Sequence, residues 1–249
     1  MRIFLCLVLC IALGSCKSDD DSIVNSPFSG EAYVPIVEGA ERIFLMDSIV
    51  FGTEGDVFFT DTTVYYLKEQ VEEAIEFDGR QFIAIDQYKS ESLGGPWEFY
   101  KRVYDLIEDS SYRRIDENLE LVYFAFPPYL GKSWNTTSLI NQSVGIPIGT
   151  NYVKIYEKWD DAFMIDFYPT YELGQNLLDS VFHVEYVNFE NVSGNFVEVR
   201  FEERFFAINR GLVKRQVRML DSQNNTGGVL DYENFIEAGY QLEQTLIFQ

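Results

Sequence analysis

Alternating apolar and charged residues mark the clearest predicted β-strand of this 249-residue chain, at positions 196–205. Its apolar side carries Val197, Val199, Phe201 and Phe205, and its charged side carries Glu198, Arg200, Glu202 and Arg204. Successive side chains of a strand point to opposite faces, so one side can pack on a core while the other meets solvent. We therefore expect the apolar side to be buried and the charged side to be exposed.

Similar strand-like runs recur along the chain and are separated by turn-forming residues. The runs occupy positions 42–51, 57–59, 62–66, 153–159, 162–167, 180–189 and 212–220. The turn signals lie at 52–56, 78–79, 209–211 and 224–228. Such runs, with almost no helical pattern between them, predict an all-β and mostly antiparallel fold. We expect a curved sheet, half-barrel, barrel or sandwich with little helix.

One stretch, 67–75, is ambiguous between helix and strand. Leu67, Val71, Ala74 and Ile75 recur at the spacing of one helix face. The neighbouring strand runs and the hairpin-like pair Asp78-Gly79 favour one long strand instead. The pattern alone does not decide between the two.

The N-terminal segment has the layout of a secretory signal peptide. Arg2 supplies a positive charge, and the apolar run 3–13 that follows is too short for a permanent membrane span. Leu13-Gly14-Ser15-Cys16 then resembles the bacterial lipobox, in which the cysteine is lipidated and becomes the first residue of the mature chain. The resemblance implies that Cys16 carries a lipid anchor, and two or more acyl chains give stable membrane attachment.

This layout divides the chain into three predicted segments. Residues 1–15 are a lipoprotein signal peptide, residues 16–29 are a flexible acidic tether, and residues 30–249 are a single β domain. Within the tether, the Ser-Asp-Asp-Asp run at 18–21 is similar to the export signal of Bacteroidetes-type surface lipoproteins. That resemblance implies anchoring in a bacterial outer membrane with exposure at the cell surface.

The charge balance limits the expected partners. Removing residues 1–15 leaves 18 Lys and Arg against 40 Asp and Glu, a net charge of −22. Nucleic acids and anionic lipid surfaces are also negative, so we expect no nucleic-acid partner and a membrane contact through the lipid on Cys16. Cys6 and Cys10 lie in the segment expected to be removed, which leaves no disulfide and no thiolate nucleophile.

No motif indicates a catalytic site, a bound metal or a cofactor. Gly131-Lys132-Ser133 ends like a phosphate-binding loop, but Phe126 stands where its first glycine is required. The one histidine, His183, has no cysteine with which to share a zinc ion, so we expect a structural role for it. The acidic pairs at 160–161 and 202–203 are the nearest to a glycosidase arrangement, and an acidic chain carries such pairs on solvated faces anyway.

Four triplets are similar to the sequon used for O-glycosylation in the Bacteroidetes periplasm, Asp-Ser/Thr followed by an apolar residue or Thr. They give the candidate sites Ser22, Ser48, Thr62 and Ser180. The three tryptophans, in addition, are candidates for stacking against a ligand such as a sugar, although most aromatic rings in such a domain belong to the core. These are Trp97, Trp134 and Trp159.

Two patches resemble parts of secreted bacterial lipoproteins of unassigned function. The first is a proline-ended strand at 121–128 with a Gly-x-x-Trp turn at 131–134, and the second is a strand corner at 204–214. Some proteins with similar corners are half-barrels like the lipoprotein carrier LolA, which implies a concave apolar sheet face. Here Asn209-Arg210 replaces the more usual small residues before the glycine of the corner.

These observations predict a lipid-anchored envelope or surface lipoprotein with a binding or scaffolding role and no catalysis. Its expected partners are the membrane, through Cys16, and an envelope protein or glycan. One alternative is a LolA-like carrier of an apolar ligand or acyl chain, which needs a continuous apolar groove. The other is a glycan-binding protein or glycoside hydrolase of the envelope, and the hydrolase needs two carboxylates about 5 to 10 Å apart in a cleft.

Overall fold

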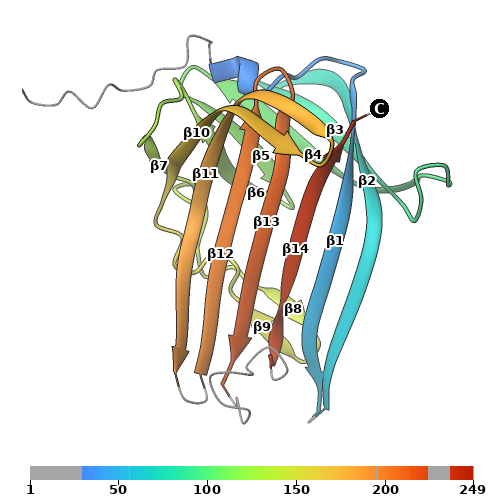
Figure 1. Cartoon of the computed structure of the whole chain (residues 1–249), viewed down its shortest axis with the longest axis vertical. Helices are drawn as coiled ribbons and strands as arrows, with labels where there is room; N and C mark the ends of the chain where they lie inside the picture. Colours follow the sequence, from blue (N-terminus) through green and yellow to red (C-terminus); the bar gives the residue numbers. More distant parts are fainter. Residues whose placement is uncertain (1–29, 56, 194–195, 224–235, 249) are drawn as a thin grey trace, which may run out of the picture.

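The computed structural model of the chain describes residues 30–55, 57–193, 196–223 and 236–248, and strands account for most of them (Figure 1). A short 3₁₀ helix, η1 (Gly30–Tyr33), comes first. The strands that follow are β1 (Glu41–Glu54), β2 (Val57–Phe77), β3 (Arg80–Ser90), β4 (Glu98–Glu108), β5 (Ser111–Asp116), β6 (Leu119–Ala125), β7 (Ser133–Asn135), β8 (Ile146–Ile148), β9 (Asn151–Val153), β10 (Asp161–Leu173), β11 (Asn176–Ser193), β12 (Phe196–Ala207), β13 (Gly211–Ser222) and β14 (Ala238–Ile247).

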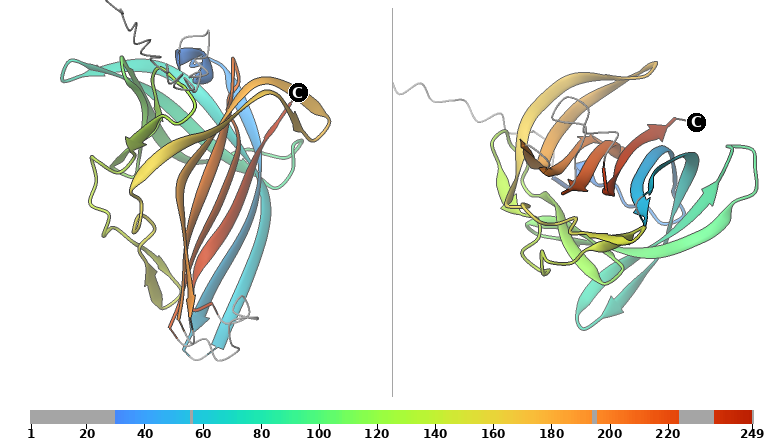
Figure 2. Two further views of the ribbon diagram at one scale, coloured as in Figure 1. Left: turned by 60° about the vertical axis from the view of Figure 1, so that its left-hand side comes forward. Right: turned by 90° about the horizontal axis from the view of Figure 1, so that it is seen from below.

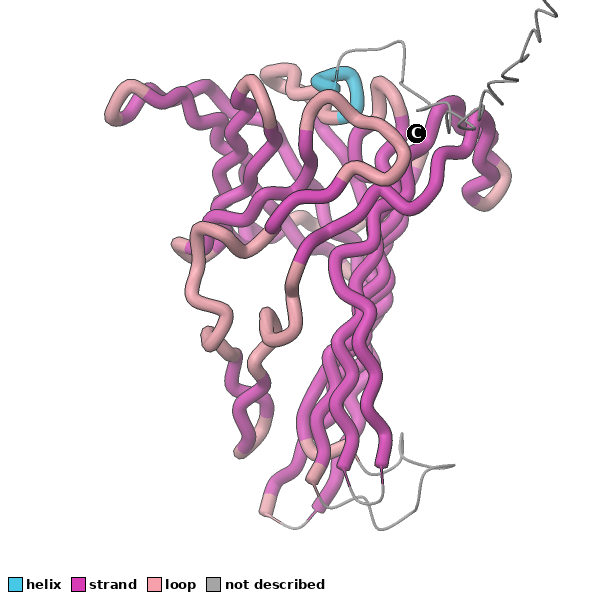
Figure 3. The backbone as a smooth tube through the Cα atoms, turned by 90° about the vertical axis from the view of Figure 1, so that its left-hand side faces the viewer, coloured by secondary structure: helices cyan, strands magenta, loops and turns pink. Residues whose placement is uncertain are grey.

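Twelve of the described strands form one antiparallel sheet, in the order β6-β5-β4-β3-β2-β1-β14-β13-β12-β11-β10-β7. Most neighbours in the sheet are also neighbours in the sequence, and the pairing of β1 with β14 joins the two halves. Strands β8 and β9 form a separate hairpin. The connection from β7 to β10 that carries this hairpin lies beside the long strands (Figure 3).

The sheet curls until its two outer strands approach each other, as the view from below shows (Figure 2). The backbone N–H of Val122 in β6 donates to the carbonyl of Thr136, just after β7, over 3.0 Å. The indole Nε1 of Trp134 in β7 donates to the carbonyl of Val122 over 2.9 Å. The all-β antiparallel prediction is confirmed, and the sheet is nearly closed into a barrel.

Two of the predicted turns lie where the sequence indicates. Asp78 and Gly79 connect β2 to β3 with φ values of +51° and +71°, the conformation that tight two-residue hairpins require. Asn209 (φ +58°) and Gly211 (φ +77°) form the corner between β12 and β13. The turn at 52–56 is shorter than predicted because β1 continues to Glu54, and the predicted turn at 224–228 lies outside the described residues.

The stretch 67–75 lies within β2, so the helical alternative is wrong. Leu67, Glu69 and Val71 are the buried positions of this stretch and alternate as in a strand, whereas Ala74 and Ile75 are exposed. The helical spacing is misleading because it treats Glu69 as a solvent-facing residue, although this side chain is only 2% exposed. A buried charge therefore hides the strand period in the sequence.

The strand predicted at 153–159 is also largely wrong. Only its first residue, Val153, belongs to a strand, β9, and turns follow up to Trp159. Val153 and Trp159 are nevertheless both buried. Their burial explains the apolar pattern, because a loop that covers a core needs apolar residues without forming a ladder of hydrogen bonds.

Helix η1 lies at the top of Figure 1, and buried aromatic residues pack around its Tyr33. Tyr33 of η1 is fully buried and packs against Phe124 and Phe182, with ring centroids 5.9 and 5.0 Å apart. Phe206 of β12 packs on Phe124 at 4.8 Å. Aromatic pairs at these separations add to the stabilisation from buried area. The core next to η1 is therefore built from apolar residues.

The charged side of β12 faces inward, which is the reverse of the prediction. Arg200, Glu202 and Arg204 are each 1% exposed. The alternation itself is correct, but the apolar side is also covered: Val199 and Phe205 belong to separate buried clusters on the other face. A strand buried on both faces gives no sequence signal of which side lines the barrel interior.

Candidate functional site

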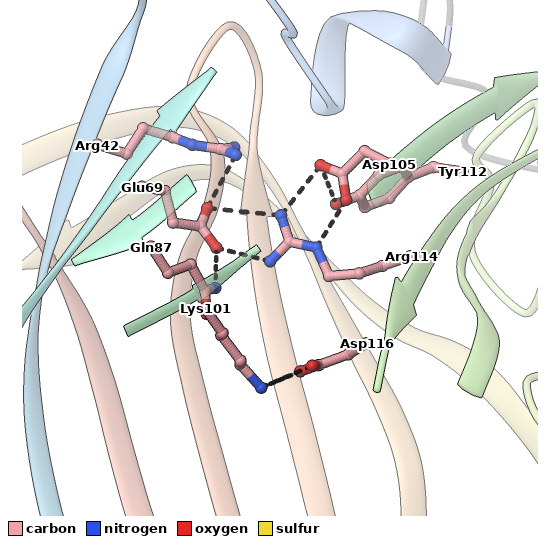
Figure 4. A network of polar contacts seen from close by, with 8 residues as sticks. All are labelled: Arg42, Glu69, Gln87, Lys101, Asp105, Tyr112, Arg114 and Asp116. Atoms are coloured by element: carbon pink, nitrogen blue, oxygen red, sulfur yellow. Dashed lines mark hydrogen bonds and ion pairs between the residues drawn. The ribbon is translucent and has the colours of Figure 1, made fainter. Parts of the chain in front are cut away.

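Five strands of one half of the sheet contribute polar side chains to a network inside the barrel (Figure 4). Its members are Arg42 (β1), Glu69 (β2), Gln87 (β3), Asp105 (β4) and Arg114 (β5). Sheet register brings them together, since Glu69 lies opposite both Arg42 and Gln87, and Asp105 lies opposite Arg114. Side chains at such opposite positions are direct neighbours.

Arg114 lies between the two carboxylates of this first network. Its Nη1 is 2.7 Å from Oε1 of Glu69, and its Nε is 2.7 Å from Oδ1 of Asp105. Arg42 and Gln87 also donate to Glu69, over 3.0 and 2.9 Å. Two guanidinium groups thus balance two carboxylates, which makes the first network neutral overall.

The arginines control the protonation of Glu69. Burial alone would raise the pKa of this carboxyl, but the charges of Arg114 and Arg42 and the hydrogen bonds from Arg114 and Gln87 outweigh it and lower the pKa to about 2. Asp105 accepts a hydrogen bond from the hydroxyl of Tyr112 over 3.0 Å, and burial raises the pKa of that phenol well above its ordinary value. Glu69 is therefore ionised, and Tyr112 protonated, at neutral pH.

A second network lies on the opposite half of the sheet, around Glu202 of β12. Nε of Arg204 is 2.6 Å from Oε1 of Glu202, and Arg215 of β13 donates to both carboxylate oxygens over 2.8 and 3.0 Å. The guanidinium of Arg204 also packs over the rings of Tyr123 and Tyr186, at 3.8 and 4.4 Å from their centroids. Burial would raise the pKa of Glu202, but the two arginines lower it.

A cavity of about 160 Å³ is lined by members of both networks. Its charged and aromatic lining comprises Glu69, Arg114, Arg204, Arg215, Lys101, Asp116, Tyr65, Tyr100 and Tyr123. Nζ of Lys101 is 2.6 Å from the Asp116 carboxylate (Figure 4). A second cavity of about 640 Å³ shares Tyr65 as a lining residue and is also lined by Lys89 and Ser48. We take the smaller cavity, the luminal cavity below, as the candidate site.

The three predicted stacking residues do not form one surface. Trp134 and Trp159 both pack on Tyr186 in the core, at centroid distances of 6.2 and 6.0 Å. Trp97 lies in the connection between β3 and β4, where Lys68 is 5.4 Å from its ring centroid. Trp134 instead acts in closing the sheet, through its hydrogen bond to β6.

The predicted modification sites are dispersed. Cys16 and Ser22 lie outside the described residues. Ser48 is half-buried and lines the larger cavity, Thr62 is exposed on β2, and Ser180 is half-buried on β11. Lipidation of Cys16 and glycosylation of the serines and the threonine stay predictions.

The acidic pairs considered for a glycosidase are not assembled into one cleft. Asp160 and Asp161 are exposed, Glu202 belongs to the second network, and Glu203 lies on the other face of β12. Glu203 is 2.8 Å from Nε2 of His183, and the histidine ring stacks on Phe205 at 4.2 Å. His183 thus has a carboxylate partner and an aromatic partner on that face.

The residues of the luminal cavity were missed by sequence reasoning, although one signal was present. Arg200, Glu202 and Arg204 alternate in sign along one side of β12. Charges of opposite sign at positions i and i+2 can pair with each other and with neighbouring strands, so such a side can be buried. No comparable signal marks Glu69 or Arg114, whose mutual contact joins β2 to β5, strands that are not consecutive in the sequence.

Comparisons with known proteins give a limited result. No family model matches the chain, and no curated protein is significantly similar to it in sequence. Two solved structures are similar, each covering 86% of this chain and 98% of its own, with a TM-score of 0.36. One is a protein described as exported, with a YmcC-like fold, from Bacteroides fragilis (11% identity), and the other is described as a lipoprotein from Parabacteroides distasonis (10% identity).

Identity and TM-score are too low for these two proteins to indicate what the present chain binds. No family model supports the resemblance of the corner patches to LolA, which stays a prediction. In the described part of the chain, no helix is long and apolar enough to cross a membrane. Within the same ranges, no cluster of three or more His, Cys, Asp or Glu side chains is arranged to hold a metal ion.

Proposed function

We propose that this chain is a lipid-anchored protein of the bacterial envelope that binds a small ligand in the luminal cavity without transforming it. The observation that carries the proposal is the cavity itself, because charged and aromatic side chains from both halves of the sheet converge on it. Binding sites commonly combine an enclosed space with a few polar groups that fix the ligand's orientation. The lipobox-like residues 13–16 support the anchor.

The state of the carboxylates favours binding over catalysis. Arginines lower the pKa of both Glu69 and Glu202 against the effect of burial, so neither carboxyl holds a proton at neutral pH. A general acid needs a pKa near the operating pH, as in glycosidases, where that of the acid is raised. These two groups are suited to orient arginines rather than to deliver protons.

The lining also argues against the apolar carrier. A carrier of acyl chains needs a continuous apolar groove, whereas Arg204, Arg215, Lys101 and the first network line the luminal cavity. Burying a hydrocarbon chain against these groups would remove water from charges without replacing its hydrogen bonds. We therefore favour a ligand that carries polar groups.

Native mass spectrometry of the full chain in detergent tests the binding role. We expect a bound small molecule that is released on denaturation and is recovered intact after prolonged incubation. Leu212→Trp adds bulk at a lining residue of the cavity and should reduce occupancy at least tenfold. Leu177→Trp, at a position that is 65% exposed, is the matched control. Absence of any bound molecule, or conversion of that molecule by the protein, would refute the proposal.

The anchor is tested separately in cells. A fatty-acid analogue should label the wild-type chain and should not label Cys16→Ala, because the acyl chains are attached to that residue. Cys10→Ala changes a cysteine of the predicted signal peptide and should leave the labelling intact. Equal labelling of the wild type and Cys16→Ala would remove the anchor from the proposal.

A further inference from the structure

The second network carries more positive than negative charge. Arg204 and Arg215 share the single carboxylate of Glu202. The tyrosines around them do not supply the missing negative charge, since burial raises the pKa of Tyr186 and raises that of Tyr240 to about 12. Around the luminal cavity, Lys101 pairs with Asp116 and the first network is neutral. Among the described residues, the charged lining and its ion-pair partners Arg42, Asp105 and Glu202 together comprise five cations and four carboxylates, which leaves one positive charge in excess.

This excess charge is buried, where it is costly. Glu202 and Arg204 each expose only 1% of their side chains, and Nη1 of Arg204 has no hydrogen-bond partner among the described residues. An uncompensated charge in a protein interior is strongly destabilising, because the low dielectric replaces water. Arg215 exposes 24% of its side chain and lines the cavity. A group of negative charge in the cavity would remove the imbalance.

We propose that the luminal cavity binds a small organic anion, whose oxyanion group is held by Arg215 with Arg204 behind it. This inference rests on the proposed binding function and names the class of ligand. Guanidinium groups hold carboxylate and phosphate oxygens through paired, charge-assisted hydrogen bonds. Tyr65, Tyr100 and Tyr123 line the same space and offer aromatic faces to the rest of the ligand.

Calorimetric titration of the full chain at constant ionic strength tests the inference. The probes are sodium benzoate, which is a carboxylate, inorganic phosphate, and benzylammonium chloride, a cation that is similar in shape to benzoate. We expect at least one of the two anions to bind the wild type and benzylammonium not to bind. Whichever anion binds more tightly identifies the oxyanion group that the cavity prefers.

Two substitutions on β13 locate the site. Arg215→Met removes the excess charge and leaves the pair between Glu202 and Arg204, so the fold is expected to persist, as circular dichroism can check. Anion affinity should fall at least tenfold. Arg218→Met removes the same charge from the same strand, at an outward position beside Phe201, and should leave the affinity unchanged. Equal affinities in the wild type and both variants would overturn the inference.

A third variant, Glu202→Gln, increases the excess positive charge of the second network instead of removing it. Glu202→Gln removes the carboxylate that Arg204 and Arg215 share, which doubles the excess charge. The melting temperature should fall without anion and recover when the bound anion is added, and the affinity should exceed that of the wild type. Weaker anion binding in a folded Glu202→Gln would contradict the inference, and if this variant does not fold, the Arg215→Met comparison decides.

The failure of this inference can be told apart from failure of the proposed function. A neutral or cationic molecule bound in native mass spectrometry, with no anion binding in calorimetry, would overturn the ligand class and leave the binding role. No bound molecule and no anion binding would overturn both.

Discussion

At the scale of single residues, the unusual feature of this protein is the set of ionised side chains inside the barrel. Arg200, Glu202, Arg204 and Glu69 are all at most 2% exposed, and Asp105 is fully buried beside them. Replacing a buried ion pair by apolar residues is often neutral, whereas removing one partner leaves the other charge without compensation. The cost of losing Glu69 should therefore be large, because two arginines depend on it.

Glu69→Gln should lower the free energy of unfolding by about 3 kcal/mol at pH 7. The pKa of Glu69 falls from 4.5 to about 2 on folding, so its contribution is complete above pH 4.5 and is lost as the pH falls towards 2. The difference between wild type and variant should therefore shrink between pH 5 and pH 2. Urea denaturation at several pH values measures it, with the exposed Glu172→Gln as a control expected within about 0.5 kcal/mol. A pH-independent difference would contradict this account.

At the scale of elements, β14 joins the two halves of the sheet by pairing with β1 on one side and β13 on the other. Near its start, Gly239 lies opposite Phe51 and Leu220. A Cβ added to Gly239 would lie 2.3 Å from the carbonyl oxygen of Met219 and 2.8 Å from Cα of Leu220. Backbone atoms cannot yield as a flexible side chain does, so only glycine fits here.

Gly239→Ala should therefore destabilise the protein by about 3 kcal/mol, because strand β14 must move away from β13. Gly94, in the loop between β3 and β4, has no atom within 4 Å of an added Cβ and is the matched control. Gly94→Ala should change the free energy of unfolding by less than about 0.5 kcal/mol. Chemical denaturation of both variants provides the comparison, and equal effects would show that the contact at Gly239 does not limit packing.

Strand pattern was enough to predict many of the elements, but it did not single out β3, β4 or β5, and it did not reveal which strand faces line the interior. Alternation over 196–205 correctly indicates a strand, and the glycine-containing turns at 78–79 and 209–211 correctly indicate hairpins. The side of β12 that carries Glu202 could not be placed, because residues distant in sequence bury both of its faces. Partners on other strands likewise bury the charge of Glu69, and this buried charge made the pattern of β2 resemble a helix.

At the scale of the whole molecule, the candidate site depends on closure of the sheet. Glu69 and Arg114 come from β2 and β5, whereas Arg204 and Arg215 come from β12 and β13, on the other side of the β1–β14 pair. No local pattern relates these residues, because only the curvature of the whole sheet brings the two networks to one cavity. The sequence could predict a curved antiparallel sheet, but not which polar side chains would meet inside it.

The distribution of charge predicts how salt affects stability. The full chain has a net charge of −21, while the lining of the luminal cavity has a small positive excess, so the negative charge is concentrated on the exterior. Repulsion among exposed charges destabilises a compact state and is screened at a Debye length of about 10 Å in 0.1 M salt, whereas buried ion pairs are screened much less.

Raising NaCl from 10 to 300 mM should therefore increase the melting temperature, with each kcal/mol gained corresponding to about 2–4 °C for a protein of this size. An equal rise in the melting temperature of Arg215→Met would assign the effect to screening rather than to chloride bound in the cavity. A fall in the melting temperature of both the wild type and Arg215→Met would contradict the prediction and would mean that exposed ion pairs, such as Lys68 with Glu41, outweigh the repulsion.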